Sequence, residues 1–261
     1  MRYGFLKGVC RHAPSVPRLM FTVSGWPWLL GDCLGWRRQP YQLRTRGGAC
    51  CELRPGTSDW WIFLEIFVFG YYQRVKEDIR RSKVIIDIGA NVGFFAVYAA
   101  AIKPEVEIQA FEPFPKNVAQ MGKNLLLNPK HHIHVHSEAV ADKTGVATLY
   151  FTPGDDSGCS LNEAKGQSCS VNVIGVNDLF RICGIEKCDL LKMDCEGSEL
   201  SILTALSPGL LAKIGAVIME YHVAEELDAI SGIFSRAGFQ CEILPEIHTL
   251  YAGRRQVGGK A

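Results

Sequence analysis

The fold is decided by the stretch VIIDIGANVGFF, which spans residues 84–95. Four of its first five residues are β-branched aliphatics, as in a strand that is covered on both faces. Gly89 and Gly93 follow, and glycine lets a chain turn tightly and approach a ligand closely. Residues 94–102 are apolar nearly all round, as in a buried helix. The stretch therefore predicts a buried strand, a glycine turn and a helix.

Two kinds of ligand could use such a turn. A dinucleotide pyrophosphate requires G-x-G-x-x-G, but Asn91 stands at the position of the middle glycine. Asp87, two residues before Gly89, would also repel a phosphate. Its carboxylate suits a cationic ligand, such as the ammonium and sulfonium groups of S-adenosylmethionine. A nicotinamide dehydrogenase is therefore the weaker alternative.

The composition indicates an ordinary globular protein. Of the 261 residues, 48% are hydrophobic and 21% are charged, and a chain of this length can form one domain with an N-terminal extension. The formal net charge of +1 gives no electrostatic reason to expect a nucleic-acid partner. The ten cysteines form no C-x-x-C pair, so we expect reduced thiols and a cytoplasmic protein.

The N-terminal part is expected to be an extension. We place it at residues 1–56, with a small hairpin within 41–53 around two glycines. The apolar stretch at 19–36 is interrupted by Pro27, Asp32 and glycines, so it predicts neither a secretory signal nor a transmembrane segment. Its three tryptophans could touch a membrane surface, but we expect them to pack on the main domain.

Strand and helix patterns alternate along the rest of the chain, which predicts an α/β fold with a mostly parallel sheet. We expect strands at residues 84–88, 106–111, 131–136, 188–194, 216–221, 239–244 and 248–252, the last two as a closing antiparallel pair. Residues 143–175 break the alternation. There, two strands of an added antiparallel piece flank a long loop at 152–167, which could form a lid.

Acidic residues near three predicted elements suggest a nucleoside ligand. Glu112 follows the second strand, where a carboxylate can accept hydrogen bonds from both ribose hydroxyls of either candidate cofactor. Glu138 and Ala139 follow the third strand, on the nucleobase side of the crevice. Glu65 lies in an otherwise apolar helix before Gly70, where it needs a partner or a ligand unless it faces solvent.

Ionisable side chains also end the fourth and fifth strands. Lys192, Asp194 and Glu196 follow the fourth strand, and Glu220 and His222 follow the fifth. Ligands of an open α/β sheet bind beyond the carboxyl ends of its strands. Methyl transfer to a hydroxyl needs an oriented oxygen and a base for its proton. His222 is the best base by its ordinary pKa, Asp194 could orient its imidazole, and Lys192 could lower the pKa of a bound hydroxyl.

Two other interpretations of these residues stay open. Asp194, Glu196, Glu220 and His222 could bind a divalent cation that orients the acceptor, although we do not favour a metal. They could also form a structural ion-pair network. The row of histidines within residues 131–136 is expected to be a solvated face of an edge strand rather than a metal site.

Five motifs, taken in order, resemble those of the FkbM-type methyltransferases, a branch of the class I S-adenosylmethionine-dependent enzymes. They are VIIDIGANVG (84–93), FEPFPKN (111–117), AVADKTG (139–145), LKMDCEGSE (191–199) and MEYH (219–222). The resemblance covers about residues 57–252 and implies a methyltransferase domain at 57–261. It also implies a Rossmann-like, doubly wound, seven-stranded sheet with an antiparallel C-terminal strand. Ser198 stands where the family usually has alanine.

The resemblance implies O-methylation of a hydroxyl on a sugar, a glycan or a secondary metabolite. The cofactor-binding residues that it implies are Asp87, Gly89, Ala90, Asn91 and Gly93 for the methionine end, Glu112 and Pro113 for the ribose, Glu138 and Ala139 for adenine, and Glu65 in the segment before the first strand. It does not identify the base, so His222 is a hypothesis from chemistry. The alternative function is a non-catalytic module that binds S-adenosylmethionine within an assembly.

Overall fold

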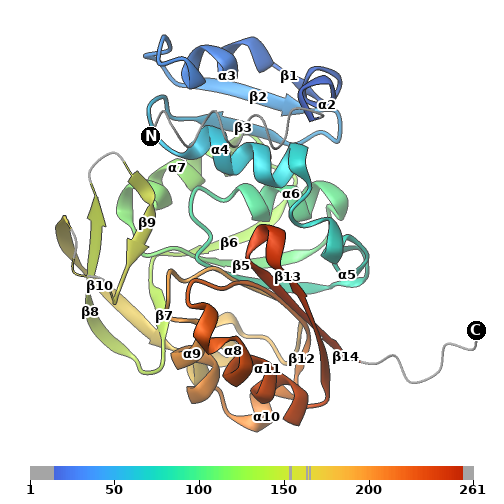
Figure 1. Cartoon of the computed structure of the whole chain (residues 1–261), viewed down its shortest axis with the longest axis vertical. Helices are drawn as coiled ribbons and strands as arrows, with labels where there is room; N and C mark the ends of the chain where they lie inside the picture. Colours follow the sequence, from blue (N-terminus) through green and yellow to red (C-terminus); the bar gives the residue numbers. More distant parts are fainter. Residues whose placement is uncertain (1–14, 153–154, 163, 165, 255–261) are drawn as a thin grey trace, which may run out of the picture.

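The centre of the molecule is a seven-stranded sheet in the order β13-β14-β12-β11-β4-β5-β6 (Figure 1). The computed structural model describes residues 15–152, 155–162, 164 and 166–254. The strands are β4 (Val84–Ile88), β5 (Glu107–Phe111), β6 (His132–His136), β11 (Cys188–Met193), β12 (Ile214–Glu220), β13 (Phe239–Leu244) and β14 (Thr249–Arg254). β14 is antiparallel to β12 and β13, and the other neighbouring pairs are parallel. The predicted doubly wound α/β sheet is confirmed.

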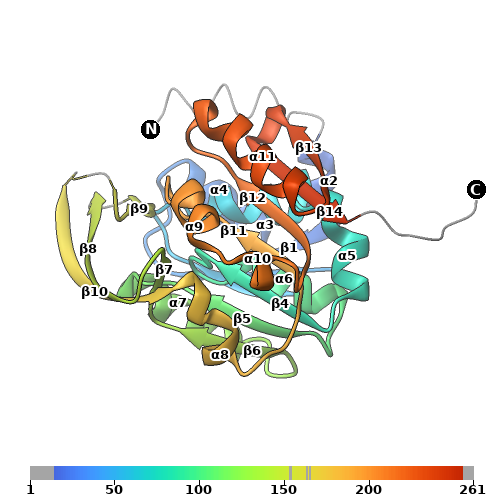
Figure 2. The same ribbon diagram turned by 90° about the horizontal axis from the view of Figure 1, so that it is seen from below.

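Alternating side chains of the central strands enter two hydrophobic layers. Ile85 joins the layer that contains Phe94, whereas Ile86 and Ile88 join the layer that contains Leu203. The helices of the first layer are α5 (Lys76–Arg81), α6 (Phe94–Ile102) and α7 (Pro115–Leu126), and those of the second are α8 (Leu179–Cys183), α9 (Glu199–Ala205), α10 (Pro208–Leu211) and α11 (Leu227–Arg236) (Figure 2). Short 3-10 helices lie at η2 (Gln73–Val75), η3 (Val176–Asp178), η4 (Ala224–Glu226) and η5 (Pro245–Ile247).

The two glycines of the turn after β4 are needed because other parts of the protein approach them. Both have positive φ, 75° at Gly89 and 81° at Gly93. A Cβ on Gly89 would collide with the backbone carbonyl of Asp194, and one on Gly93 would lie 2.7 Å from Cγ of Met121. Glycine is therefore required to bring the end of β11 and helix α7 against the turn.

The N-terminal part packs over α6 and α7, on the side of the first hydrophobic layer (Figure 1). Its elements are α2 (Ser15–Thr22), β1 (Val23–Ser24), α3 (Trp26–Cys33), β2 (Tyr41–Thr45), β3 (Cys50–Leu53), α4 (Asp59–Leu64) and the π-helix η1 (Glu65–Phe69). Asn124 of α7 and Asn128, just after that helix, hydrogen-bond the backbone of β3 and fix it there. The expected packing of the tryptophans is wrong for Trp28 and Trp36, which are 54% and 76% exposed, because Leu29 takes the core position of α3.

The predicted loop at 152–167 is wrong over part of its length. A four-stranded sheet in the order β7-β10-β8-β9 is built from β7 (Ala139–Ala141), β8 (Gly145–Thr152), β9 (Asp155–Ser160) and β10 (Gln167–Gly175). The sequence of β9 has little strand propensity, and its pairing with β8 overrides that propensity. Ser160 at its end donates a hydrogen bond to the backbone carbonyl of Glu196, so the added sheet contacts the predicted site.

The histidine row lies on an edge strand, as expected. His132 and His134 are exposed on β6. His136 is half-buried instead, because it stacks on Phe111 and its Nε2 lies 2.7 Å from Oε1 of Gln109. No helix within the described residues has the length and the apolar run that a membrane crossing requires.

Candidate active site

One cavity lies beside the turn after β4, at the carboxyl ends of β5 and β6. Residues from the ends of these strands and of β11 line it. The predicted residues in its wall are Gly89, Asn91, Glu112, Pro113, Glu138, Ala139, Asp194 and Glu196. All four residues expected near the ribose and adenine are thus together in one wall.

Glu112 is the best-defined acid of this cavity. It is 5% exposed, and its two carboxylate oxygens accept hydrogen bonds from the backbone N–H groups of Asn91 (2.8 Å) and Phe114 (2.9 Å). Burial raises the pKa of Glu112 to about 7, although these N–H groups oppose the rise. The fixed carboxylate is therefore in place to accept from hydroxyls, and it is more strongly ionised above pH 7 than below it.

A second cavity adjoins the first and shares Gly89, Asn91, Asp194 and Glu196 with it. Its other predicted residues are Glu65, Ala90, Lys192 and Glu220, and aromatic side chains including Trp61 and Tyr72 complete the wall. Glu65 is the first residue of the π-helix η1. π-helices are rare, and they occur often at functional sites. Burial raises the pKa of Glu65 to about 7, and burial together with Asp194 raises the pKa of Glu220 to about 8.

Asp87 lies behind the turn rather than in a cavity wall. It is fully buried, and its Oδ1 lies 3.1 Å from Nζ of Lys192. That ammonium also donates to the backbone carbonyl of Gly89 at 2.7 Å. Burial lowers the pKa of Lys192, but Asp87, Tyr72 and Asp194 outweigh it and hold that pKa above its ordinary value. Asp87 therefore acts on the turn through a buried ion pair.

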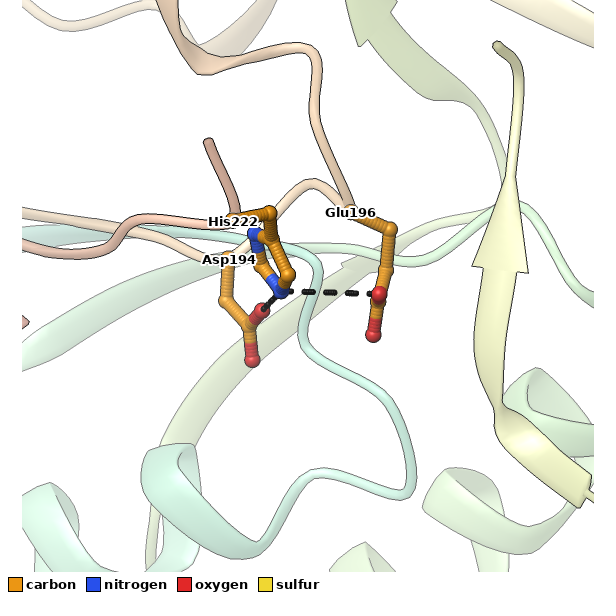
Figure 3. A group of neighbouring side chains, drawn as sticks. All are labelled: Asp194, Glu196 and His222. Atoms are coloured by element: carbon orange, nitrogen blue, oxygen red, sulfur yellow. Dashed lines mark ion pairs between the residues drawn. The ribbon is translucent and has the colours of Figure 1, made fainter. Parts of the chain in front are cut away.

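His222 contacts three carboxylates, and the two that Figure 3 shows, Asp194 and Glu196, line both cavities. Its Nε2 lies 3.4 Å from Oε2 of Glu196 and 3.8 Å from Oδ1 of Asp194, which Figure 3 marks as ion pairs. Its Nδ1 lies 3.0 Å from Oε1 of Glu199. Burial alone would lower the pKa of His222, but the three acids together raise it to about 9. The imidazole is therefore mostly protonated at pH 7, unlike a histidine of ordinary pKa.

A family model described as "Methyltransferase FkbM domain" matches residues 87–241, more than half of the chain. The chain belongs to the FkbM methyltransferase family. The resemblance of the five motifs is thereby confirmed, and the protein is a methyltransferase. Its family implies an S-adenosylmethionine cosubstrate, so the nicotinamide dehydrogenase alternative is wrong.

Several relatives of this FkbM methyltransferase have named activities. It is 26% identical over 245 residues to the 31-O-demethyl-FK506 methyltransferase FkbM of Streptomyces tacrolimicus, covering 81% of this chain and 92% of that one. It is 24% identical over 182 residues to the hexuronic acid methyltransferase AglP of Haloferax volcanii, covering 69% and 74%. It is 23% identical over 226 residues to the AMB antimetabolite synthetase AmbE of Pseudomonas aeruginosa, covering 70% of this chain and only 11% of that protein.

The candidate site also contains an acid that sequence reasoning missed. Glu199, in the first turn of α9, is 1% exposed and accepts from the backbone N–H of Cys195 at 2.9 Å as well as facing His222. Asp194 was expected to orient the imidazole, but Glu199 makes the shorter contact. The sequence could have indicated Glu199, because it is an acid at the start of a predicted helix that directly follows a strand with a charged end.

The FkbM methyltransferase carries a polar atom that fits the implied cofactor. Oδ1 of Asn91 is buried and accepts no hydrogen bond from any residue that the structure describes. Asn91 lies in the walls of both cavities and adopts a positive φ of 52°. A buried carbonyl oxygen without a donor is costly, and the ammonium group of S-adenosylmethionine would supply one. The residues present therefore fit the cofactor.

A divalent cation is the remaining alternative for the His222 cluster. One ligand atom from each of Asp194, Glu196 and His222 lies within 4.8 Å of the others. A metal would require a neutral imidazole. The acids around His222 raise its pKa, so a bound metal would have to displace its proton, and the same contacts equally fit an ion-pair network.

Proposed function

We propose that this FkbM methyltransferase transfers a methyl group from S-adenosylmethionine to a hydroxyl oxygen of a sugar, a glycan or a secondary metabolite. The observation that carries the proposal is the meeting of two cavities at Asn91, with the His222 cluster at their junction. The names of two relatives, a 31-O-demethyl-FK506 methyltransferase and a hexuronic acid methyltransferase, support acceptors of these classes.

In this proposal the first cavity holds the ribose and adenine of the cofactor, and the second holds its methionine end. Glu112 and Pro113 would hold the ribose, and Glu138 and Ala139 would lie beside adenine. Asn91 would accept from the methionine ammonium, with Gly89 and Ala90 lining the passage and Gly93 shaping the turn. The carboxylates of Glu65 and Glu220 add negative charge near a cationic ligand, which is favourable at short range. Asp87 and Lys192 would support this arrangement from behind.

His222 is the proposed base. S-adenosylmethionine supplies an electrophilic methyl group, so an O–CH3 bond forms as the S–CH3 bond breaks. The acceptor oxygen loses its proton to Nε2 of neutral His222, and the resulting imidazolium is stabilised by Glu196 and Glu199. With a pKa of about 9, roughly 1% of His222 is neutral at pH 7, and that small fraction is a stronger base than an ordinary histidine.

The proposal is tested by calorimetric titration with S-adenosylmethionine and S-adenosylhomocysteine. Wild type is expected to bind both, and Glu112→Gln is expected to bind them roughly 10- to 100-fold more weakly, because hydrogen bonds to a charged acceptor are worth about 1.5–3 kcal/mol. Wild-type affinity should also rise between pH 6 and 8, as Glu112 ionises with a pKa of about 7. Glu112→Gln should reduce that rise to the part that comes from Glu65 and Glu220, whose pKa values are about 7 and 8.

Glu107→Gln is the matched control, because Glu107 lies on the same strand at the opposite end. Its affinity should match wild type. A folded wild-type protein that binds neither compound would refute the proposal. Binding without methyl transfer to any hydroxyl acceptor would favour the non-catalytic module instead.

Glu199 is proposed as a positioning residue that acts through His222. In wild type, kcat/KM should rise with pH up to about 9, where His222 loses its proton. Glu199→Gln removes the charge nearest Nδ1, so the inflection should move by at least about one pH unit toward 6.5. The exposed Glu225→Gln is the control and should keep the wild-type profile. An unchanged inflection in Glu199→Gln would exclude this role.

A further inference from the structure

Helix α3 buries its charged side chain and exposes apolar ones, the reverse of an ordinary surface helix. Its only charged residue, Asp32, is 6% exposed and accepts from Oη of Tyr41 at 2.9 Å and from the backbone N–H of Gly56 at 3.0 Å. Leu30 and Leu34, one turn apart, are 47% and 40% exposed. Surface helices normally direct polar residues to solvent. The outer side of α3 is therefore apolar, while its charge is satisfied inside.

Exposed apolar side chains are concentrated around this helix. Twelve large apolar side chains are exposed among the described residues, and half of them lie between positions 20 and 36. We call the outer side of α3 and its C-terminal extension the α3 face, formed by Pro27, Trp28, Leu30, Leu34 and Trp36, all of them exposed. Figure 1 shows α3 at the opposite end of the molecule from α10, with the three-stranded N-terminal sheet beneath it. Such a cluster marks an interaction surface.

The N-terminal part of the sequence is also its basic part. Residues 1–56 contain nine basic and two acidic residues, a formal charge of +7, whereas the whole chain carries +1. The rest of the chain is therefore net negative. Arg38, Arg44 and Arg46 are exposed close to α3 in sequence or on β2 and its turn. The guanidinium of Arg37 lies 4.5 Å from the ring centre of Trp28, so basic and aromatic groups adjoin each other.

We propose that the α3 face binds an anionic lipid surface. Tryptophan and leucine enter the boundary between headgroups and acyl chains, and arginine pairs with anionic headgroups. The eight residues of α3 span about 12 Å, far less than a membrane crossing needs. The helix therefore lies on the surface. The charge of this region favours an anionic membrane over a second copy of the chain, whose matching face would carry the same positive charge.

The test is flotation of the full chain with vesicles. We expect at least about tenfold more bound protein on phosphatidylcholine vesicles that contain about 30% phosphatidylglycerol than on pure phosphatidylcholine. Leu30→Glu/Leu34→Glu should reduce that binding about tenfold, because it places two carboxylates on the α3 face. Arg38→Glu, which leaves the apolar side chains intact, should reduce it several-fold and more strongly at low salt.

Val146→Glu is the matched control, since Val146 is an apolar residue with 70% exposure on β8, in a different sheet. It should bind vesicles as wild type does, and thermal unfolding should show that all variants are folded. Absence of wild-type binding to anionic vesicles would overturn the proposal, as would undiminished binding by Leu30→Glu/Leu34→Glu. A wild-type dimer in sedimentation that this double variant dissociates would assign the α3 face to a second copy instead.

Discussion

Replacing His222 by alanine is expected to lower kcat by about 100- to 10,000-fold, the usual contribution of a positioned base. Nε2 of His222 lies beside Asp194 and Glu196, which line both cavities, and alanine leaves no imidazole there to take the acceptor proton. The dissociation constant of S-adenosylmethionine should change little, since His222 is absent from the wall of the cavity that holds Glu112. Steady-state kinetics and calorimetry separate the two quantities.

Two further measurements make the His222 prediction decisive. His134→Ala removes an exposed imidazole from the edge strand β6 and should leave kcat unchanged. Free imidazole added to His222→Ala should restore part of the rate, because it can occupy the vacated space and accept a proton. If His222→Ala keeps the wild-type rate, the proton leaves by another route and His222 has no part in the chemistry.

Asp87→Asn is expected to give the largest loss of stability among single charge-neutralising substitutions at this site. It leaves the buried ammonium of Lys192 without its nearest carboxylate, and breaking a buried pair typically costs about 3–5 kcal/mol. The loss should fall toward the lower end, because Asp194 lies 3.8 Å from Nζ and the carbonyl of Gly89 still accepts from it. Urea unfolding followed by fluorescence measures the change.

Binding of S-adenosylmethionine should weaken in Asp87→Asn as well, because only Gly89 and Asp194 would then hold Lys192 against the turn. Glu77→Gln is the control, since it neutralises an exposed acid that pairs with Arg80 and should cost no more than about 1 kcal/mol. Equal stabilities of the two variants would show that the Asp87–Lys192 pair contributes no more than a surface pair.

Much of the fold could be predicted from local patterns. The predictions of the strand at 84–88, the glycine turn and the following helix are confirmed, as are the succession of strands along the chain and its closing antiparallel pair. These features depend on side-chain periodicity and glycine chemistry over a few neighbouring residues. The β9 strand was missed because its residues form a strand only when β8 is present to pair with them.

The sequence predicted which residues lie at the candidate site, but not which of them contact one another. The sequence places Glu112, Asp194 and His222 at strand ends. In the structure Glu112 and Asp194 line a cavity, and His222 lies beside Asp194. The sequence did not indicate that Glu199 contacts His222, or that three acids raise the pKa of that histidine to about 9. Charge interactions depend on distances between atoms, and these distances are set by the packing of distant segments.

Within the stretch at 84–95, some features follow from the sequence alone and others only from the tertiary structure. By itself the sequence determined that a strand turns through glycines into a helix, and that Asn91 replaces the phosphate-binding glycine. Only the tertiary structure decided that Gly89 makes room for the carbonyl of Asp194, and that Asp87 pairs with Lys192, whose ammonium reaches back over 103 residues of chain to the turn. The conformation of the turn depends on steric contacts between neighbouring residues, which the sequence specifies directly. The partner of the buried Asp87 carboxylate is brought to it only when the parallel strands β4 and β11 lie side by side.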